Sequence, residues 1–326
     1  MIISRTPFRL SLGGGGTDLP SYYKSYGGFF VSGAVNRYVY ITVNKRFEED
    51  SLRVSYSTTE IVPSAEDVQH RVVSQALKLV GVQRGIEIVS VADAPAASGL
   101  GSSGSFCVGL LNALHTYLHQ DITRRDLAEE ACDIAMNRLG EPSGKQDEYV
   151  ASYGGISAYE IAKDGKVTVT PLALSTNTLA ELEASIMVFY TGITRSASEV
   201  LLKQQNAIEK DGAAEKMHQI REIGLESRDA LVGGDLTRFG ELLHEHWTVK
   251  RGIVDGMSAD PVDRWYWIAR ENGALGGKIV GAGGGGFLML YCDNGRKKLR
   301  KAMAQEGLME HRFRFDFEGS KVIYNV

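Results

Sequence analysis

A loop rich in glycine and serine, Pro95 to Ser105 with the sequence PAASGLGSSGS, is the first place where residue types suggest chemistry. It follows residues 85–94, whose alternating pattern predicts a strand, and precedes residues 106–118, whose apolar spacing predicts a helix. Glycine lets backbone N–H groups turn toward a ligand, and a helix start adds unsatisfied donors and the positive end of a dipole. The loop therefore indicates an anion site, with a plain connector as the alternative.

This loop matches neither of two common phosphate-binding motifs. It lacks the lysine of the pattern G-x-x-x-x-G-K-[ST], and the pattern G-x-G-x-x-G does not fit from Gly99 onward. Other segments of the chain must therefore support a phosphate-binding role.

Three further glycine-rich segments contain residues that are candidates for catalysis or binding. The segment TPFRLSLGGGGTDLP places Arg9 before four glycines and Asp18 after them, and LGEPSGKQDEY places Lys145 and Asp147 after a predicted turn. The segment GGKIVGAGGGGFLML places a glycine-rich loop, residues 281–286, between two predicted strands. Because glycine costs backbone entropy, such clusters indicate that the backbone closely approaches a ligand or another segment.

The elements that must position these residues form two groups along the chain. In the first half, strand-like runs alternate with helical patterns at about residues 68–80, 104–119 and 124–139. The pattern begins again near residue 185, with predicted strands at 185–192, 278–280, 287–292 and 313–318 and predicted helices at 196–232, 260–273 and 295–307. We therefore predict an α+β fold of two domains that join near residues 175–185.

The composition is typical of a folded globular protein without a broad basic surface. The 326 residues, 43% of them hydrophobic, are enough for two hydrophobic cores. Because the net charge is −4, we expect a small-molecule partner and no nucleic acid. The three cysteines are widely spaced, and the sequence has neither a signal-peptide pattern nor a long apolar segment. These features predict a cytoplasmic protein with no membrane partner. The composition is compatible with a homo-oligomer but does not specify one.

In their order along the chain, three of the glycine-rich segments resemble motifs of the GHMP small-molecule kinases, the superfamily of galactokinase, homoserine kinase, mevalonate kinase and phosphomevalonate kinase. The segments RTPFRLSLGGGGTDLPSYY, GLGSSGSF and LGEPSGKQDEYVASYGG are most similar to the D-glycero-D-manno-heptose 7-phosphate kinases. The resemblance implies a two-domain α+β GHMP kinase fold. Its N-terminal domain, residues 1–180, would be ribosomal protein S5 domain 2-like and would carry the ATP-binding loop. Its C-terminal domain, residues 181–326, would be ferredoxin-like.

The same resemblance implies a role for individual residues, with ATP and Mg²⁺ as cofactors. Asp147 would orient or deprotonate the attacking hydroxyl, and Arg9 would assist it as a nearby cation. The hydroxyl of Ser102 or Ser103 would bind the Mg²⁺ ion. The residues expected to contact the nucleotide are Pro95, Ser98, Gly99, Leu100, Gly101, Ser102, Ser103, Gly104 and Ser105. Those expected to contact the substrate are Gly14, Gly15, Thr17, Asp18, Lys145, Arg195, Gly283 and Gly284.

Several of these residues also have a purely structural interpretation. Asp18 would accept hydrogen bonds from sugar hydroxyls, or it would cap the helix predicted after it. Lys145 and Arg195 would hold a second phosphate on the substrate, or they would be solvated surface charges. Residues 281–286 would close over the phosphates and the sugar, or they would allow tight packing between strands.

One position departs from the pattern of the superfamily. A glutamate usually supplies a second Mg²⁺ ligand from the helix before the aspartate motif, and Ala135 occupies that position here. Mg²⁺ keeps several waters and binds nucleotide phosphates, so we expect weaker metal binding rather than none. The expected reaction phosphorylates the anomeric hydroxyl of D-glycero-D-manno-heptose 7-phosphate to give the 1,7-bisphosphate. The alternatives are a kinase for an unphosphorylated sugar of the galactose or fucose type and a catalytically weak sugar or nucleotide sensor.

Overall fold

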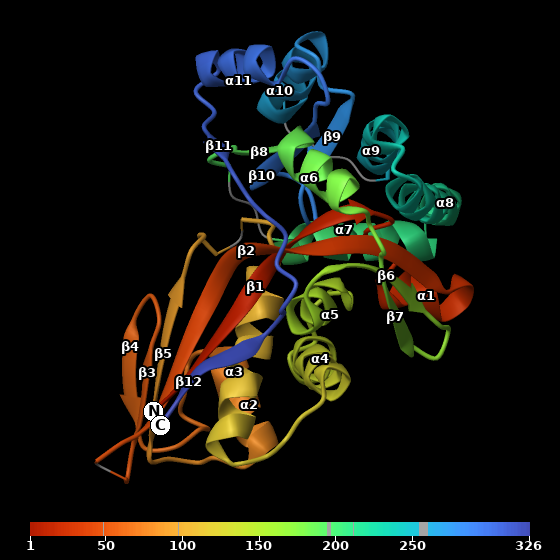
Figure 1. Ribbon diagram of the computed structural model, residues 1–326. Coiled ribbons are helices and arrows are strands. Elements are labelled where there is room, and N and C mark those ends of the chain that lie inside the picture. Colours follow the sequence, from red (N-terminus) through yellow and green to blue (C-terminus); the bar gives the residue numbers. More distant parts are fainter. Residues whose placement is uncertain (48, 97, 194–196, 211, 254–259) are drawn as a thin grey trace.

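Two β-sheets, each with its own helices, form the chain in the computed structural model (Figure 1). The structure describes residues 1–47, 49–96, 98–193, 197–210, 212–253 and 260–326. Helices and strands occur together in both halves of the chain, which confirms the predicted α+β character.

The larger sheet has eight strands and is built around two long neighbours, β1 (Ile2–Gly13) and β2 (Gly28–Lys45). Along the main path the strand order is β12-β1-β2-β5-β3-β4, and β6 and β7 extend the sheet beside the first half of β2. The remaining strands are β3 (Leu52–Ser55), β4 (Thr59–Val62), β5 (Ile86–Ala92), β6 (Ile156–Ile161), β7 (Val167–Pro171) and β12 (Lys321–Asn325). All pairs are antiparallel except β3 with β5.

One face of this sheet carries helices and the other is open in the view of Figure 1. The covering helices are α2 (Arg71–Val80), α3 (Ser102–Tyr117), α4 (Arg124–Cys132) and α5 (Gln146–Tyr153). Their apolar side chains and those of β1, β2 and β5 form the main hydrophobic core. Short helix α1 (Pro20–Tyr26) follows β1, and a π-helix, Asp133–Arg138, continues α4.

The smaller sheet has four antiparallel strands in the order β11-β8-β10-β9. These strands are β8 (Ile186–Tyr190), β9 (Gly276–Ile279), β10 (Phe287–Tyr291) and β11 (Glu310–His311). The helices of this half are α6 (Thr176–Ser185), α7 (Ala197–Lys210), α8 (Ala214–Gly233), α9 (Leu236–Arg251), α10 (Asp260–Glu271) and α11 (Arg296–Gln305). A second core, which includes Trp247 and Tyr266, fills the space between this sheet and its helices.

The last strand, β12, returns to the larger sheet and pairs antiparallel with β1. The two ends of the chain therefore lie side by side, as Figure 1 shows. The prediction that residues 181–326 form the C-terminal domain is wrong at its far end, because residues 321–325 complete the first sheet.

Most predicted elements appear near their expected positions, and two differ. The long helical stretch predicted at 196–232 is two helices, α7 and α8, with Gly212 at φ 68° between them. The strand predicted at 313–318 is reduced to one isolated bridge between Phe315 and Val35. This segment lies beside β2 between the part that pairs with β6 and the part that pairs with β5, so there is room for only one bridge.

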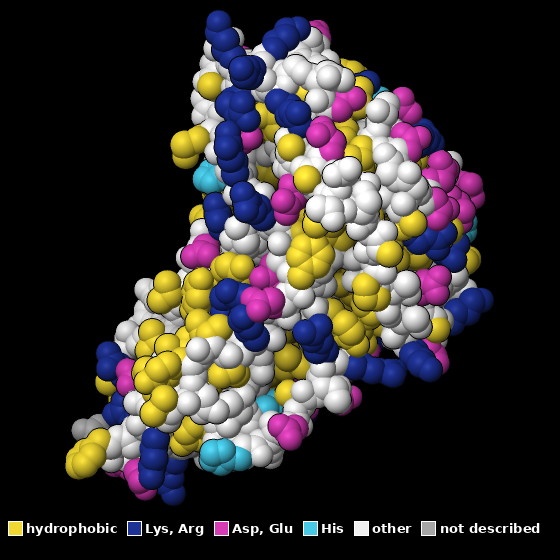
Figure 2. All heavy atoms as spheres, viewed as in Figure 1, with side chains coloured by type: hydrophobic (Ala, Val, Ile, Leu, Met, Phe, Trp, Pro, Cys, Tyr) yellow, Lys and Arg dark blue, Asp and Glu magenta, His cyan; other side chains and the backbone are white. Residues whose placement is uncertain are grey.

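Hydrophobic side chains gather on the part of the surface formed by the strands β2 to β5 (Figure 2). Ile61 on β4 and Val91 on β5 are among the exposed ones. In the part of the chain that the structure describes, no helix combines the length and apolar character needed to cross a bilayer.

Candidate active site

A cavity of about 590 Å³ lies where the two halves of the molecule meet. Its walls come from β1, the glycine and serine loop, the starts of α3 and α5, the π-helix, α7, α9, and β9 with the turn after it, and parts of β2, β5 and α2 complete them. It gathers Arg9, Asp18, Asp147, Gly281 and most of the glycine and serine loop, so all four glycine-rich segments of the sequence contribute to one site.

The glycine and serine loop ends at the start of α3, as predicted. Gly101 precedes the helix at φ 77°, a left-handed conformation that glycine adopts at little cost, and Ser102 is the first helical residue. The loop residues that line the cavity are Ala96, Gly99, Gly101, Ser102, Ser103 and Gly104, so the N-terminus of α3 faces the cavity. This is the arrangement that favours an anion.

The other predicted loop residues build the loop rather than line the cavity. Ser105 donates a hydrogen bond from Oγ to the Pro7 carbonyl at 2.8 Å, and the Leu100 carbonyl accepts one from the Arg9 backbone N–H at 3.0 Å. Ser98 is fully buried, and neither it nor Pro95 is among the described residues that line the cavity.

Asp147 and Arg9 form an ion pair at the floor of the cavity. Arg9 is buried on β1, and its Nε and Nη2 atoms lie 2.8 and 2.7 Å from Oδ1 of Asp147. The Arg9 Nη1 atom also donates to the Gly99 carbonyl, so one guanidinium holds both the aspartate and the loop. Asp147 is in the first turn of α5, where the helix dipole favours a carboxylate.

Asp18 lines the same cavity and is oriented by backbone donors. Its Oδ1 accepts a hydrogen bond from Gly16 N, and its Oδ2 accepts one from Gln146 N, each at 3.0 Å. Burial raises the pKa of Asp18, and the hydrogen bond from Gln146 opposes that shift. The capping alternative is wrong, because the N-cap of α1 is Leu19 and has no side-chain cap.

The first glycine cluster serves both packing and the cavity. Gly14, at φ 73°, packs so closely that a Cβ atom would lie 2.2 Å from the Phe29 carbonyl. Thr17 donates its hydroxyl to the carbonyls of Gly14 and Phe29 and is fully buried. Neither of them is among the described cavity-lining residues, whereas Gly15 and Gly16 are.

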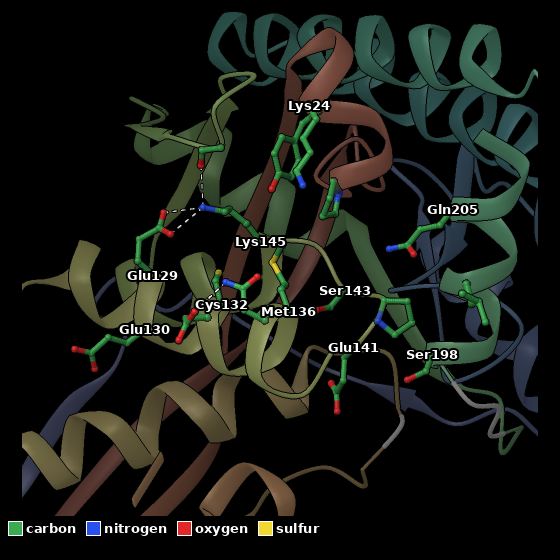
Figure 3. A pocket seen from close by; sticks show the side chains of 18 of the residues that line it. Lys24, Glu129, Glu130, Cys132, Met136, Glu141, Ser143, Lys145, Ser198 and Gln205 are labelled. Carbon is green, nitrogen blue, oxygen red and sulfur yellow. Dashed lines mark hydrogen bonds and ion pairs between the residues drawn. The ribbon is translucent and has the colours of Figure 1, made fainter. Parts of the chain in front are cut away.

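Lys145 points away from this cavity into a neighbouring one of about 1030 Å³, shown in Figure 3. Its Nζ donates to both carboxylate oxygens of Glu129, at 2.9 and 2.8 Å, and to the Gly165 carbonyl at 2.8 Å. Its charge is therefore already paired, which does not support a second-phosphate role. The other residue predicted for that role, Arg195, lies outside the described residues.

The turn after β9 reaches the cavity through Gly281 and Ala282 rather than through the predicted Gly283 and Gly284. It also packs tightly on the glycine and serine loop. A Cβ atom on Gly281 would lie 2.7 Å from the Gly99 carbonyl, and one on Gly286 would lie 2.2 Å from the Ser98 carbonyl. The packing alternative therefore accounts for much of this glycine cluster.

This packing makes Gly99 a sensitive position. We expect Gly99→Ala to raise the KM for the ATP that the resemblance implies by about 10-fold and to lower the Tm, because a Cβ atom would lie 2.4 Å from the Val280 carbonyl. Steady-state kinetics and thermal unfolding measure the two effects. Gly81→Ala is the matched control, since Gly81 has a similar φ of 77° but a Cβ there would meet no atom within 4 Å. Equal losses of ATP affinity in both variants would contradict the packing role.

Several cavity residues were not predicted from the sequence. Glu148, next to Asp147, is buried and its Oε2 has no hydrogen-bond partner. Burial, together with the neighbouring Asp147, raises the pKa of Glu148 to about 8. Two lysines, Lys250 on α9 and Lys278 on β9, also line the cavity. No pattern in the sequence distinguished these lysines from surface charges, although the position of Glu148 beside Asp147 was a usable signal.

Part of the cavity lining is apolar and partly aromatic. The rings of His70 and Phe106 stack with their centroids 4.9 Å apart at an angle of 24°, and Val39 and Val72 lie in the same wall. A flat aromatic and aliphatic surface of this kind suits a planar ring, such as a nucleobase.

The donor set suits a metal ion that arrives with a phosphate ligand. In the described segments, no group of three or more histidine, cysteine, aspartate or glutamate side chains could hold a metal alone. The cavity does offer the hydroxyls of Ser102 and Ser103 and the unpartnered carboxylate oxygen of Glu148. Mg²⁺ commonly takes only one or two protein oxygens beside phosphates and waters, so these residues fit it.

Comparison with known proteins places the chain in one family. The models of the GHMP kinases N terminal domain and the GHMP kinases C terminal domain match residues 69–155 and 227–307, together more than half of the chain. The D-glycero-alpha-D-manno-heptose 7-phosphate kinase of Campylobacter jejuni is 29% identical, over 98% of this chain and 98% of the relative. The mevalonate kinase of Pyrococcus horikoshii is 25% identical, over 85% of this chain and 80% of the relative.

Solved structures agree with the family models. A D-glycero-D-manno-heptose 1-phosphate kinase from Bacteroides thetaiotaomicron superposes with a TM-score of 0.82 at 25% identity and covers all of both chains. A Lactococcus lactis galactokinase in complex with galactose has a TM-score of 0.79 at 19% identity, over 98% of this chain and 94% of that one, and shows the shared fold alone. The predicted fold class and the predicted family are both confirmed.

Proposed function

Since this chain belongs to the GHMP kinases, we propose that it transfers the γ-phosphoryl group of ATP to the anomeric hydroxyl of a sugar. The similarity to the D-glycero-alpha-D-manno-heptose 7-phosphate kinase of Campylobacter jejuni favours D-glycero-D-manno-heptose 7-phosphate as that sugar. The observation that carries the proposal is the pairing of Asp147 with Arg9 directly beside the start of α3. A proton acceptor, Asp147, and an anion site, the start of α3, therefore line the same cavity.

In this proposal the nucleotide spans the cavity from its apolar part to the helix start. The base lies against His70 and Phe106, and the triphosphate lies along residues 99–104, where the N-terminus of α3 favours negative charge. Ser102, Ser103 and Glu148 are the residues that would hold Mg²⁺. The ion would neutralise charge on the phosphate oxygens.

Asp147 would orient the sugar hydroxyl and accept its proton. A free aspartate is a weak base, so its contribution lies in its position, which the two hydrogen bonds from Arg9 fix. Asp18 would bind other hydroxyls of the sugar, because its carboxylate is already oriented by Gly16 and Gln146. Phosphoryl transfer depends mainly on such positioning and on neutralising charge.

One observation favours a second candidate, a kinase for an unphosphorylated sugar. The neighbouring cavity, the natural place for a distal part of the substrate, is rich in acidic side chains. Its charged lining residues are Lys24, Lys145, Glu129, Glu130, Asp133, Glu141, Asp164 and Glu199. Because Lys145 already pairs with Glu129, this cavity repels rather than attracts a phosphate.

The position of Ala135 allows a direct test of the metal site. Ala135 lies on the π-helix and lines the active cavity, whereas the next residue, Met136, lines the neighbouring one. We expect Ala135→Glu to lower the Mg²⁺ concentration needed for half-maximal rate, because it adds a carboxylate facing the phosphates. Met136→Glu is the matched control and should leave that concentration unchanged. Equal behaviour of the two variants would mean that the metal lies elsewhere.

The substrate is tested by comparing kcat/KM for a small panel of sugars with Mg-ATP. D-glycero-D-manno-heptose 7-phosphate and the same heptose without phosphate form the decisive pair, with galactose and fucose beside them. A strong preference for the 7-phosphate supports the first candidate, and a preference for a neutral sugar supports the second. Nucleotide binding without turnover on any sugar would favour a sensor on this fold instead.

A further inference from the structure

Two lysines of the C-terminal half are buried in the wall of the active cavity. Lys250, near the end of α9, is 5% exposed, and Lys278, on β9, is 2% exposed. Within the described part of the chain, neither ammonium is paired with a carboxylate, and their hydrogen-bond partners are a backbone carbonyl and a histidine. Buried charges are normally paired, so two such lysines in one wall indicate a site that awaits an anion.

Each of these ammonium groups is held in place but keeps donors to spare. Lys250 donates from Nζ to the Gly281 carbonyl at 2.7 Å, and Lys278 Nζ lies 3.0 Å from Nδ1 of His246. A lysine ammonium has three donors, so the one bond of Lys250 leaves two for a ligand.

Contacts around Gly281 place Lys250 beside the reacting end of the cavity. Gly281 packs directly on Gly99, and the Gly99 carbonyl accepts a hydrogen bond from Arg9, the partner of Asp147. Lys250 is therefore linked through two backbone contacts to the ion pair that would handle the sugar hydroxyl. The cavity region between them is where the last phosphate of the nucleotide would meet that hydroxyl.

The charges that face Lys250 come from several elements. Arg9 on β1 and Lys278 on β9 are like charges, Asp18 after β1 is the opposing one, and His246 lies one turn earlier on α9. Burial, with Arg9 as the second cause, lowers the pKa of Lys250 to about 8. Burial and Lys250 also lower the pKa of Lys278. The positive groups of this cluster therefore repel one another in the free protein, and a bound phosphoryl group would relieve that repulsion.

We propose that Lys250 binds the phosphoryl group in transfer between ATP and the sugar, rather than a phosphate that the sugar already carries. The inference rests on the proposed kinase function. The bond between the γ-phosphorus and its bridging oxygen breaks, and its electron pair leaves with ADP. The anomeric oxygen forms the new bond to phosphorus, and its proton passes to Asp147. Lys250 keeps its protons and stabilises the charge on the phosphoryl oxygens throughout. Ala135 lines this cavity and gives the metal ion no carboxylate ligand, so Mg²⁺ is expected to bind weakly. The positive charge of Lys250 would help to neutralise the phosphoryl oxygens at this site.

The test measures two affinities and compares them. One is for ADP, and the other is for an ATP analogue that has a nitrogen bridge between its β and γ phosphates. Isothermal titration calorimetry with Mg²⁺ measures both. In wild type we expect the analogue to bind more tightly than ADP. Lys250→Met should reduce that preference by about 10-fold or more while ADP affinity stays within about 3-fold, and kcat should fall about 10². Lys250→Arg should retain part of the preference, because it keeps a cation at the site.

Lys301→Met is the matched control, since Lys301 is an exposed lysine on α11, away from the cavity wall. It should change neither affinity nor kcat. If Lys250→Met retains the wild-type preference for the analogue, the inference is overturned. It is also overturned if the only change is a higher KM for a phosphorylated sugar, since Lys250 would then bind the phosphate that the substrate carries.

The pH dependence of the two affinities tests the inference on the wild-type protein, without any variant. Because Lys250 is charged below about pH 8 and neutral above it in the free protein, the preference for the analogue should fall as pH rises through this range. A preference that stays constant up to pH 9.5 would overturn the inference. Failure of the kinase proposal itself gives a different result, namely no sugar-dependent turnover although the preference and its pH dependence are present.

Discussion

Asp147→Asn is expected to lower kcat by at least about 10² while ATP affinity stays near the wild-type value. The asparagine amide keeps the size of the side chain and one acceptor oxygen, but it cannot take the proton of the sugar hydroxyl. It also loses the charge that pairs with Arg9. Because Asp147 is not part of the glycine and serine loop, the nucleotide should still bind. Steady-state kinetics give kcat, and calorimetry with the nitrogen-bridged analogue gives the affinity.

Asp133→Asn is the matched control for this variant. Asp133 lies on the π-helix, pairs with Arg138 and lines the neighbouring cavity, so the same chemical change there should leave kcat within about 2-fold. A normal kcat in Asp147→Asn would remove this residue from the mechanism. A comparable loss in both variants would show that any nearby change of charge affects the rate.

Arg9→Met should also lower kcat by about 10², through two effects of one side chain. It removes both hydrogen bonds that orient Asp147 and the one that holds the Gly99 carbonyl. It also leaves Asp147 without its cation, so part of the loss comes from a misplaced carboxylate. Because the loop is released as well, the KM for ATP should rise about 3- to 10-fold. Initial rates over a range of ATP concentrations separate the two effects.

Arg5→Met serves as the control on the same strand. Arg5 pairs with Glu318 and Asp316, far from the active cavity, so its loss should affect stability at most. If Arg9→Met changed only the Tm, Arg9 would be a structural residue. The double variant with Asp147→Asn adds a further check, since the two losses should not add if the residues act as a pair.

The parts of the fold that were predictable from the sequence are those with a strong local pattern. The helix start at Ser102 follows from the loop and the apolar spacing after it, and helices α10 and α11 carry clear periodicity. The return of β12 to β1 was not predictable, because the pairing joins residues more than 300 positions apart. The segment 313–318 alternates like a strand, yet its neighbours along β2 leave room for only one bridge.

The site shows the same division between local and distant information. Asp147, Arg9 and the serines of α3 belong to short motifs, so their types and spacing were enough to single them out. Lys250 lies in a helix with many charged residues, and only the packing of α9 beside β9 makes it a buried cation. Gly14 and Thr17 lie in a motif as well, but tight packing against Phe29 explains their types.

Phosphorus NMR of a reaction with Mg-ATP tests the central claim most directly, because it identifies the acceptor of the phosphoryl group. The sugars are D-glycero-D-manno-heptose 7-phosphate, the same heptose without phosphate, galactose and fucose, with Asp147→Asn as the inactive control. We predict a new phosphate signal on the anomeric position of one sugar, formed in a one-to-one ratio with ADP and absent in the variant. Intact ATP with every sugar, or inorganic phosphate as the only product, would contradict the claim that this protein is a sugar kinase.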